Sequence, residues 1–443
     1  RLISRFIPYV GVALRFSKCP YEYIQSLRQY YGEDIFTVYI MGSFMTFVCH
    51  PKDVSSIFNS PKNFEMHDLA LEFSHKLFGV SEKIYHMEDG VNDAAFKMIT
   101  KYLQKDDLPV MTRKAQVKLE ACLLEELGCA GEWKECDLED FVFRLICDAS
   151  TFALFGEGLP FEELRAKFRA FDEQLLILGS NMPQLVKKEA HKLRQRYIDM
   201  FKAPIHDNAC NLVKARSDLY KGLVDENDAA ALMMIINWVS LTNTISATFW
   251  SLYYLLKLPS KYREDIIEET RTILREVEHL KEPNSLLPPL THELLNKMPK
   301  LDAVIDESLR MSTCLFVNRR AASNLKFTDR KNRVYKFTRR EHLMLVPSHT
   351  DEEIFENPSE FQPYRFLGKN ERKWTKDGDP IKLSGAFMVF GGGLHACPGR
   401  FFAKNEMKLM VCVLLQTLGF ELLTKGDAIP DKRQFGLFFT KPL

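Results

Sequence analysis

The chain has 443 residues, 46% of them hydrophobic, and its formal net charge at pH 7 is +1. That length and composition allow a large buried core, while the near-neutral charge excludes the basic footprint of a nucleic-acid-binding protein. Length alone allows two or three domains. No Gly/Ser-rich or Pro-rich linker divides the sequence, so we predict one domain over residues 1–443.

Ten cysteines are scattered without a Cys-x-x-Cys pair or a regular spacing. This pattern argues against a disulfide framework or a zinc site and favours a reducing compartment. The sequence begins at Arg1 without a methionine, and no hydrophobic anchor precedes it. Either the protein lacks an anchor or an N-terminal segment has been removed.

In chain order, an extended lead-in over residues 6–15 precedes a helix over residues 20–31, whose apolar positions recur at helical spacing. Two β-rich runs, 35–40 and 44–48, predict a hairpin. Helical patterns fill residues 51–285, and two further strands flank a turn at 329–332. We therefore predict a mainly α fold with a minor β part. The basic run at 330–340 indicates either a solvated hairpin or a contact with a membrane or an acidic partner.

The segment 229–256 contains no charged residue and is long enough to span a membrane. It nevertheless carries eight polar side chains, which would be poorly served by lipid but could be satisfied inside a protein. We predict a buried central helix, and a membrane span is the alternative. The polar residues are Asn237, Ser240, Thr242, Asn243, Thr244, Ser246, Thr248 and Ser251.

Two short motifs follow this segment. Glu307 and Arg310 share a helix face at i and i+3 and can pair, although most such pairs are merely solvated. Arg319 lies in the run Asn318-Arg319-Arg320, where the alternatives are an anion-binding arginine and a surface arginine. A Pro-x-Arg-Phe segment with Arg365 comes later in the chain.

Near the C-terminus an apolar run ends in three glycines, and one cysteine follows before Pro-Gly opens a helix over residues 400–418. Glycines let a backbone turn tightly and approach a flat ligand closely. Cys397 lies beside a helix N-terminus, which favours the thiolate, and a thiolate there can be the axial ligand of a haem iron. The alternative is a glycine-rich turn with a structural cysteine.

This stretch resembles the Phe-x-x-Gly-x-Arg/His-x-Cys-x-Gly haem loop of the cytochrome P450 family, and the resemblance extends over residues 6–443. It implies the mainly helical fold of that family, with haem b bound through Cys397 as proximal ligand. It also implies that His395 and Arg319 face the haem propionates. Glu307, Arg310 and Arg365 would form the bonded triad that supports the loop. The matching loop residues are Phe390, Gly393, His395, Cys397 and Gly399.

Two positions depart from the family pattern. No tryptophan occurs around residues 92–120, so the propionate contacts on that side stay unassigned. On the central helix, Asn243-Thr244 replaces the usual acid-threonine pair, and an amide cannot titrate but can donate and accept hydrogen bonds. The surrounding string looks very like the branch that contains the cholesterol 7α-, oxysterol and sterol 12α-hydroxylases and prostacyclin synthase. The alternative for Asn243 is an amide satisfied in the core.

The resemblance implies a mono-oxygenase that hydroxylates a sterol, an oxysterol or a similar lipid, with Asn243 and Thr244 as catalytic residues. The alternative is an isomerase of a lipid endoperoxide or hydroperoxide that needs neither dioxygen nor a reductase; a haem carrier without turnover is a third class. A substrate pocket would be lined by Phe316, Val317, Leu437 and Phe438.

NADPH–cytochrome P450 reductase, with cytochrome b5 as a second candidate, would supply electrons to a monomer. The resemblance also implies location on the cytosolic face of the endoplasmic reticulum membrane, through an N-terminal anchor missing from this sequence.

Overall fold

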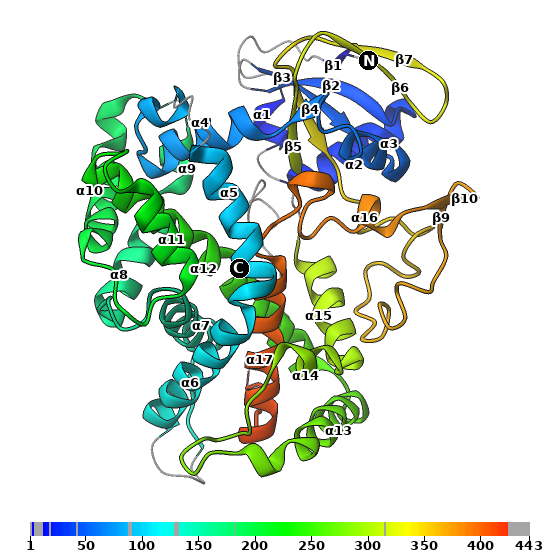
Figure 1. Cartoon of the computed structure of the whole chain (residues 1–443). Coiled ribbons are helices and arrows are strands. Elements are labelled where there is room, and N and C mark those ends of the chain that lie inside the picture. The colour runs from blue at the N-terminus through cyan, green and yellow to red at the C-terminus, as the bar shows by residue number, and fades with distance from the viewer. Residues whose placement is uncertain are drawn as a thin grey trace. The chain divides into compact units, whose positions relative to one another are not determined.

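The computed structural model describes residues 2–3, 12–16, 19–40, 43–86, 91–127, 133–180, 182–313 and 316–423 (Figure 1). Its contacts group into two compact units. Unit 1 comprises Arg1–Leu69, Asp306–Cys397 and Leu423–Leu443, and unit 2 comprises Ala70–Ile305 and Pro398–Leu422. One boundary therefore lies inside helix α15 (Pro299–Ser312). A single catalytic domain over residues 1–443 stays a prediction.

Unit 1 contains the strands that the structure describes. They are β1 (Leu2–Ile3), β2 (Ile35–Ile40), β3 (Ser43–Val48), β4 (Phe64–Glu65), β5 (Val317–Ala321), β6 (Leu325–Thr328), β7 (Val334–Phe337), β8 (His342–Leu345), β9 (Trp374–Lys376) and β10 (Asp379–Ile381). Six of them form one mixed sheet in the order β1-β2-β3-β8-β5-β4. β1 and β2, and β3 and β8, run parallel, and the other neighbours are antiparallel. The remaining strands form two antiparallel pairs, β6-β7 and β9-β10.

The large sheet is buried on both faces. Phe36 and Val38 of β2 belong to one hydrophobic cluster, while Ile35 of the same strand belongs to another that contains Leu343 and Leu345 of β8. Successive side chains of a strand point to opposite faces, so such a sheet needs apolar residues at nearly every position. The helical elements of this unit are α1 (Ala13–Phe16), α2 (Pro20–Tyr31), α3 (Pro51–Phe58), α16 (Leu383–Ala386) and η5 (Gly393–His395).

The regular elements described in unit 2 are all helices (Figure 1). Its elements are α4 (His67–Phe78, beginning in unit 1), η1 (Glu82–His86), α5 (Val91–Lys101), the π-helical η2 (Tyr102–Asp106), α6 (Leu108–Leu127), α7 (Leu138–Phe155), α8 (Phe161–Asp172), α9 (Leu175–Gly179), α10 (Gln184–Asp199), η3 (Met200–Lys202), α11 (Asn211–Tyr220), α12 (Glu226–Lys257), α13 (Ser260–Glu276), η4 (Glu278–Leu280), α14 (His292–Asn296) and α17 (Arg400–Thr417).

These elements confirm the mainly α fold with a minor β part. The predicted helix at 20–31, the hairpin arms, the strands around the turn at 329–332 and the helix from residue 400 are all present. The helical region from residue 51 is interrupted by strand β4 and by the π-helical turn η2, which periodicity did not indicate. Most of the predicted lead-in at 6–15 lies outside the described residues.

α12 is a core helix of unit 2, as predicted. Of its most apolar window, which is long and apolar enough to cross a membrane, 67% is buried inside the protein. Several of its polar side chains find partners there, although the buried Thr248 hydroxyl has none among the described residues. Asn237 accepts a hydrogen bond from the Tyr197 hydroxyl and donates to Thr151, and Thr242 donates to Asp172. Polar groups satisfied in this way cost little to bury, which explains the mixed composition of the helix.

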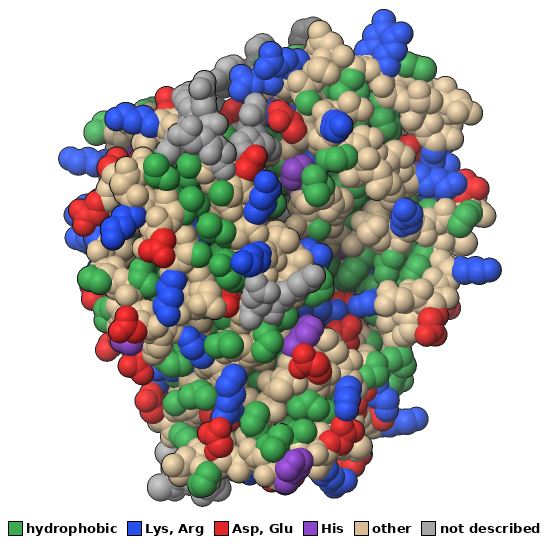
Figure 2. Space-filling view, viewed as in Figure 1, with side chains coloured by type: hydrophobic (Ala, Val, Ile, Leu, Met, Phe, Trp, Pro, Cys, Tyr) green, Lys and Arg blue, Asp and Glu red, His purple; other side chains and the backbone are tan. Residues whose placement is uncertain are grey.

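The basic run after β6 forms a neutralised turn. Arg330 pairs with Asp34 and Asp377, and Arg333 pairs with Glu33 and Asp329. Basic and acidic side chains are likewise interspersed over the face drawn in Figure 2. Lys331 also pairs with Asp34, so three basic side chains of this turn are paired within unit 1 and do not form a one-sign patch.

One buried acid in unit 2 lacks a charged partner among the described residues. Glu406 of α17 is 3% exposed and accepts a hydrogen bond from the Ser150 hydroxyl, while no described donor reaches its Oε2. Burial raises the pKa of Glu406 from 4.5 to about 8. The folded protein therefore holds a proton on this side chain at neutral pH.

This acid makes stability depend on pH. Between the unfolded pKa of 4.5 and the folded value of about 8, the folded state binds one more proton than the unfolded state, so stability falls as pH rises. Glu406→Gln should remove this decrease in stability with rising pH, because glutamine does not titrate. Relative to the parent, its free energy of unfolding should rise between about pH 5 and about pH 8 by up to about 4 kcal/mol, since each pH unit contributes at most about 1.4 kcal/mol. Urea unfolding at several pH values measures the difference, and parallel pH profiles for the two proteins would contradict it.

Candidate functional site

Unit 1 brings the neighbouring pair Glu307 and Arg310 together with Arg365, which lies more than fifty residues later in the sequence. Arg310 donates to both oxygens of Glu307 from Nε and Nη2, at 2.8 and 2.9 Å. Arg365 donates from Nε to the same two oxygens at 2.9 and 3.0 Å, and the Gln362 N–H adds a further bond at 3.0 Å. The side chains of Glu307, Arg310 and Arg365 are at most 2% exposed.

Two guanidinium groups on one carboxylate leave an excess positive charge in the interior. Backbone carbonyls offset this excess. Arg310 donates to the His349 carbonyl at 2.6 Å, and Arg365 donates to the carbonyls of Glu356 and Asn357 at 2.6 and 3.2 Å. The planar fork of arginine suits such multiple bonding, which a lysine could not reproduce. The cluster thereby ties α15 to the chain segments on both sides of residue 356.

The glycine loop lies in the same unit. Gly391 and Gly393 have φ values of +69° and +66°, a conformation that residues with a side chain rarely adopt. The Cys397 N–H closes the loop with a hydrogen bond to the Phe390 carbonyl at 2.8 Å. His395 is half-buried at the end of η5, and Cys397 is exposed. Gly399 immediately precedes α17, so the cysteine is followed closely by a helix N-terminus.

Arg319 of β5 reaches this loop. Its Nη2 donates to the Gly392 carbonyl at 3.0 Å and its Nη1 donates to the Asn318 carbonyl at 2.8 Å. Arg319 is 2% exposed, and within the described residues it forms no ion pair with a carboxylate. Burial alone lowers the pKa of Arg319 to about 10, so it remains charged at neutral pH. An uncompensated buried cation beside the loop is suited to bind an anionic group.

These features fit a haem. The positive φ values let the backbone lie close to a flat ligand, the exposed Cys397 offers a sulfur ligand for iron, and Arg319 offers a cation for a propionate. No cluster of three or more His, Cys, Asp or Glu side chains exists among the described residues that could bind a metal ion directly.

α12 has one uncovered stripe. Ile235, Val239 and Asn243 follow one another at four-residue intervals, so they share a helix face, and all three are partly exposed, Val239 to 49%. Thr244, next to Asn243, is 3% exposed. An apolar stripe left open on a core helix is suited to contact an apolar ligand, with the Asn243 amide at its end.

Two of the four predicted pocket residues are described, and both are buried in unit 1. Phe316, just before β5, is fully buried in the aromatic cluster with Phe16, Tyr21 and Phe47. Val317, the first residue of β5, is 8% exposed in the second cluster of the sheet. Their place in a substrate pocket stays a prediction. Leu437 and Phe438 lie outside the described residues.

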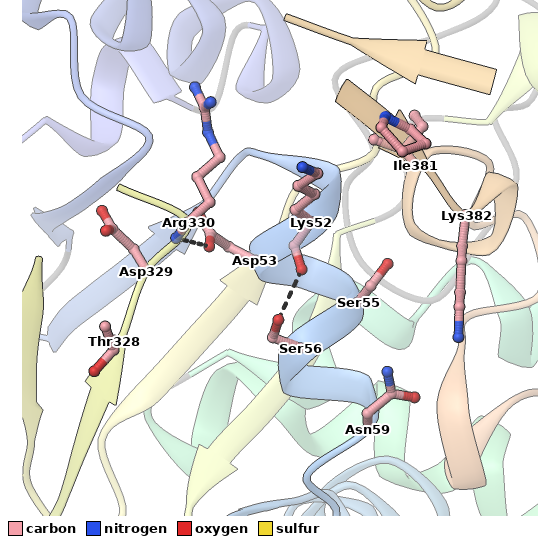
Figure 3. Close-up of a pocket in the computed structure, with 11 residues that line it drawn as sticks. Lys52, Asp53, Ser55, Ser56, Asn59, Thr328, Asp329, Arg330, Ile381 and Lys382 are labelled. Atoms are coloured by element: carbon pink, nitrogen blue, oxygen red, sulfur yellow. Dashed lines mark hydrogen bonds between the residues drawn. The ribbon is translucent and has the colours of Figure 1, made fainter. Parts of the chain in front are cut away.

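The cavity in Figure 3 is separate from the loop and has a volume of about 380 Å³. It lies between α3, the end of β6 with the turn that follows, and β10 with the next residue. Nine of its eleven lining residues are polar or charged, unlike the mostly apolar lining expected for a lipid substrate. Its lining residues are Lys52, Asp53, Ser55, Ser56, Asn59, Thr328, Asp329, Arg330, Pro380, Ile381 and Lys382.

Sequence reasoning missed three contacts of the site. Phe58 packs against the glycine loop, the Met66 sulfur lies 3.6 Å from Arg319 Nη1, and Gln104 donates to the Pro398 carbonyl at 3.4 Å. The stripe of Ile235 and Val239 was also missed. None carries a motif; only the four-residue spacing on α12 could have signalled the stripe.

Comparison with known proteins agrees with this geometry. The family described as Cytochrome P450 matches residues 3–443. The chain is 27% identical to Cytochrome P450 7B1 of Mus musculus over 98% of its own length and 86% of that protein. It is 26% identical to Cholesterol 7-alpha-monooxygenase of Cricetulus griseus (100% and 91% covered) and to Prostacyclin synthase of Homo sapiens (98% and 90% covered). These relatives bear out the branch that the central-helix string resembles.

The buried charge cluster predicts a large effect of a small change. Glu307→Gln keeps the shape but leaves two buried guanidinium groups without a carboxylate, so we expect a loss of about 3 kcal/mol or more in the free energy of unfolding. Glu268→Gln is the control, because Glu268 pairs with Arg271 and Arg275 on the surface and its loss should cost less than about 1 kcal/mol. Chemical denaturation compares the two variants; equal losses would show that the buried arginines do not depend on the Glu307 carboxylate.

Proposed function

This chain belongs to the cytochrome P450 family, and on that premise we propose that it is a mono-oxygenase that hydroxylates a sterol, an oxysterol or a similar lipid. One atom of dioxygen would enter a C–H bond of the substrate as hydroxyl. The other would leave as water, with two electrons from NADPH and two protons. NADPH–cytochrome P450 reductase would deliver the electrons, with cytochrome b5 as a second candidate donor.

The observation that carries the proposal is the glycine loop that presents Cys397 beside Arg319. Haem held by this thiolate supplies the oxygen activation. The chain itself provides the sulfur ligand, the cation for a propionate and a backbone that approaches the ring. His395 would offer a second polar contact to the propionates from the end of η5, and the Glu307 cluster would hold the loop region in place.

On α12, the open stripe would bind the apolar body of the substrate through Ile235 and Val239. The Asn243 amide would orient water or an oxygen atom by hydrogen bonding, without itself giving up a proton. The Thr244 hydroxyl would pass protons from water to that oxygen. This division of roles separates binding from proton delivery along one helix.

The substrate class rests on the relatives. The name of Cholesterol 7-alpha-monooxygenase states an oxidation of a sterol, and the match covers 100% of this chain and 91% of that protein. We propose, from the family resemblance, that this chain acts as a monomer at the cytosolic face of the endoplasmic reticulum membrane. The partly exposed apolar side chains of α12 support an apolar substrate, whereas the position oxidised depends on contacts of the bound lipid.

A second candidate is isomerisation of a lipid endoperoxide or hydroperoxide. Its support is the Asn243 amide together with the similarity to Prostacyclin synthase. An amide that hydrogen-bonds a peroxide oxygen needs no proton relay. Retention of Thr244 and of Cys397-Pro398-Gly399, which resembles the sterol hydroxylases, favours hydroxylation.

Two assays run side by side distinguish these functions. One contains cholesterol or an oxysterol with NADPH, reductase and labelled dioxygen, and the other contains a lipid endoperoxide under anaerobic conditions. We expect labelled hydroxysterol that depends on NADPH, and we expect Cys397→Ala to lose both this product and the thiolate-type ferrous–carbonyl spectrum. Rearranged product without reductant would establish the isomerase, and haem binding without product in either assay would indicate a carrier.

Asn243 should affect turnover more than stability. Asn243→Ala should lower the rate per bound haem by about tenfold or more, equivalent to about 1.4 kcal/mol, with little change in unfolding. Asn237→Ala is a matched control on the same helix. Because the Asn237 amide is buried and bonded to Tyr197 and Thr151, its loss should mainly cost stability, about 1–3 kcal/mol. If Asn243→Ala behaves like Asn237→Ala, Asn243 is a core amide.

A further inference from the structure

Phe58, the last residue of α3, lies against Gly392 and Gly393 of the glycine loop and against Arg319. It is 6% exposed and belongs to the hydrophobic cluster that also contains Met388, four residues before Gly392. Its ring faces the glycine loop on one side, and the guanidinium carbon of Arg319 lies 5.2 Å from the ring centre. No motif marks this phenylalanine in the sequence.

The contact with the loop explains why residue 392 is a glycine. Gly392 has φ −167° and ψ 167°, an extended conformation that any residue adopts. Backbone geometry therefore does not require glycine here, in contrast to the neighbouring positive-φ positions. A Cβ at Gly392 would lie 2.3 Å from Cε2 of Phe58, and the three atoms nearest to it all belong to the Phe58 ring. Glycine is required at this position because the ring occupies the space.

Arg319 meets the same ring. Its guanidinium is buried without a carboxylate in the described residues and donates to the Gly392 carbonyl at 3.0 Å. A desolvated cation beside an aromatic ring gains electrostatic stabilisation, so Phe58 favours the conformer in which Arg319 reaches the loop. The Phe58 ring, the Arg319 guanidinium and the Gly392 backbone are therefore in mutual contact, and each restricts the conformation of the other two.

The helix that carries Phe58 is itself firmly held. At the start of α3, the His50 side chain accepts a hydrogen bond from the Lys52 N–H. Asp53 accepts a hydrogen bond from the Arg330 N–H at 2.8 Å, and this second bond is drawn in Figure 3. At Gly385 of α16, a Cβ would lie 2.3 Å from the Ser55 hydroxyl and 2.5 Å from the Pro51 carbonyl oxygen. α3 therefore packs closely against the chain that leads into the loop.

We propose that Phe58 is a positioning residue of the haem-thiolate site, acting through Gly392 and Arg319. Its ring packs against Gly392 of the glycine loop and against the Arg319 guanidinium. These two contacts favour a single conformation of the loop that presents Cys397. The role rests on the proposed haem-thiolate function, and it makes Phe58 important for keeping the haem and its sulfur ligand rather than for contact with substrate.

The test compares Phe58→Leu with Phe64→Leu. Phe64 belongs to the same hydrophobic cluster, but its ring packs edge-on against Phe327 and Phe337. The two variants are compared in mild denaturant at similar unfolding stability. We expect Phe58→Leu to lose the thiolate-type ferrous–carbonyl spectrum about five-fold faster than Phe64→Leu, and to give up haem to a scavenger protein faster by the same factor. A factor of this size is expected for the loss of a partly desolvated cation–π contact. In an Arg319→Gln background the difference should shrink, because the two side chains act together.

A suppressor experiment keeps the proposal testable if Phe58→Leu folds poorly. Gly392→Ala should weaken haem retention because its methyl group meets the ring, and Gly392→Ala with Phe58→Leu should recover much of the loss because the ring is gone. Absence of recovery, together with equal behaviour of Phe58→Leu and Phe64→Leu, would overturn the proposal. A parent protein that binds no haem with a thiolate spectrum would instead overturn the proposed function.

Discussion

The buried carboxylate of Glu307 is the interaction on which unit 1 depends. It accepts bonds from two arginines and one backbone N–H in a place where water cannot solvate any of the three charges. Burying such charges costs several kcal/mol per ion, and only complete pairing recovers it. The arginines also bond to carbonyls at His349 and Glu356, so α15 and the chain leading toward the loop must keep one mutual arrangement. The cluster contributes geometry more than net stability.

The glycine loop converts that fixed arrangement into a site. Gly391 and Gly393 must be glycine because of their positive φ angles, whereas Gly392 must be glycine because the Phe58 ring leaves no room for a side chain. Three adjacent glycines are therefore required for two different physical reasons. The buried charge of Arg319 is tolerated because two carbonyls and an aromatic ring partly replace its solvation. An anionic ligand would complete that replacement, and haem binding and stability of the loop are therefore expected to be linked.

The sequence predicted the parts whose signals are local. Periodicity located α2, α12 and α17 closely, and the order of Glu307, Arg310, Arg365 and Cys397 indicated the family. It did not indicate the contacts of Phe58, since an aromatic residue at the end of an apolar helix is ordinary in any core. Nor did it indicate the burial of Val317, because the packing around a strand depends on which strands pair across hundreds of residues. The parallel pairing of β3 with β8 is such a long-range choice.

Asn243 shows how one substitution changes what a helix can do. α12 buries Asn237 in a network of neutral hydrogen bonds, but it leaves Asn243 partly exposed at the end of an apolar stripe. An acid there would be ionised in water and would lose that charge on desolvation by an apolar substrate, so its pKa would vary with the ligand. An amide keeps the same donor and acceptor whether the stripe is wet or covered. Asparagine would therefore suit the proposed role of orienting an oxygen atom beneath a large apolar ligand, with protons supplied by hydroxyl groups and water.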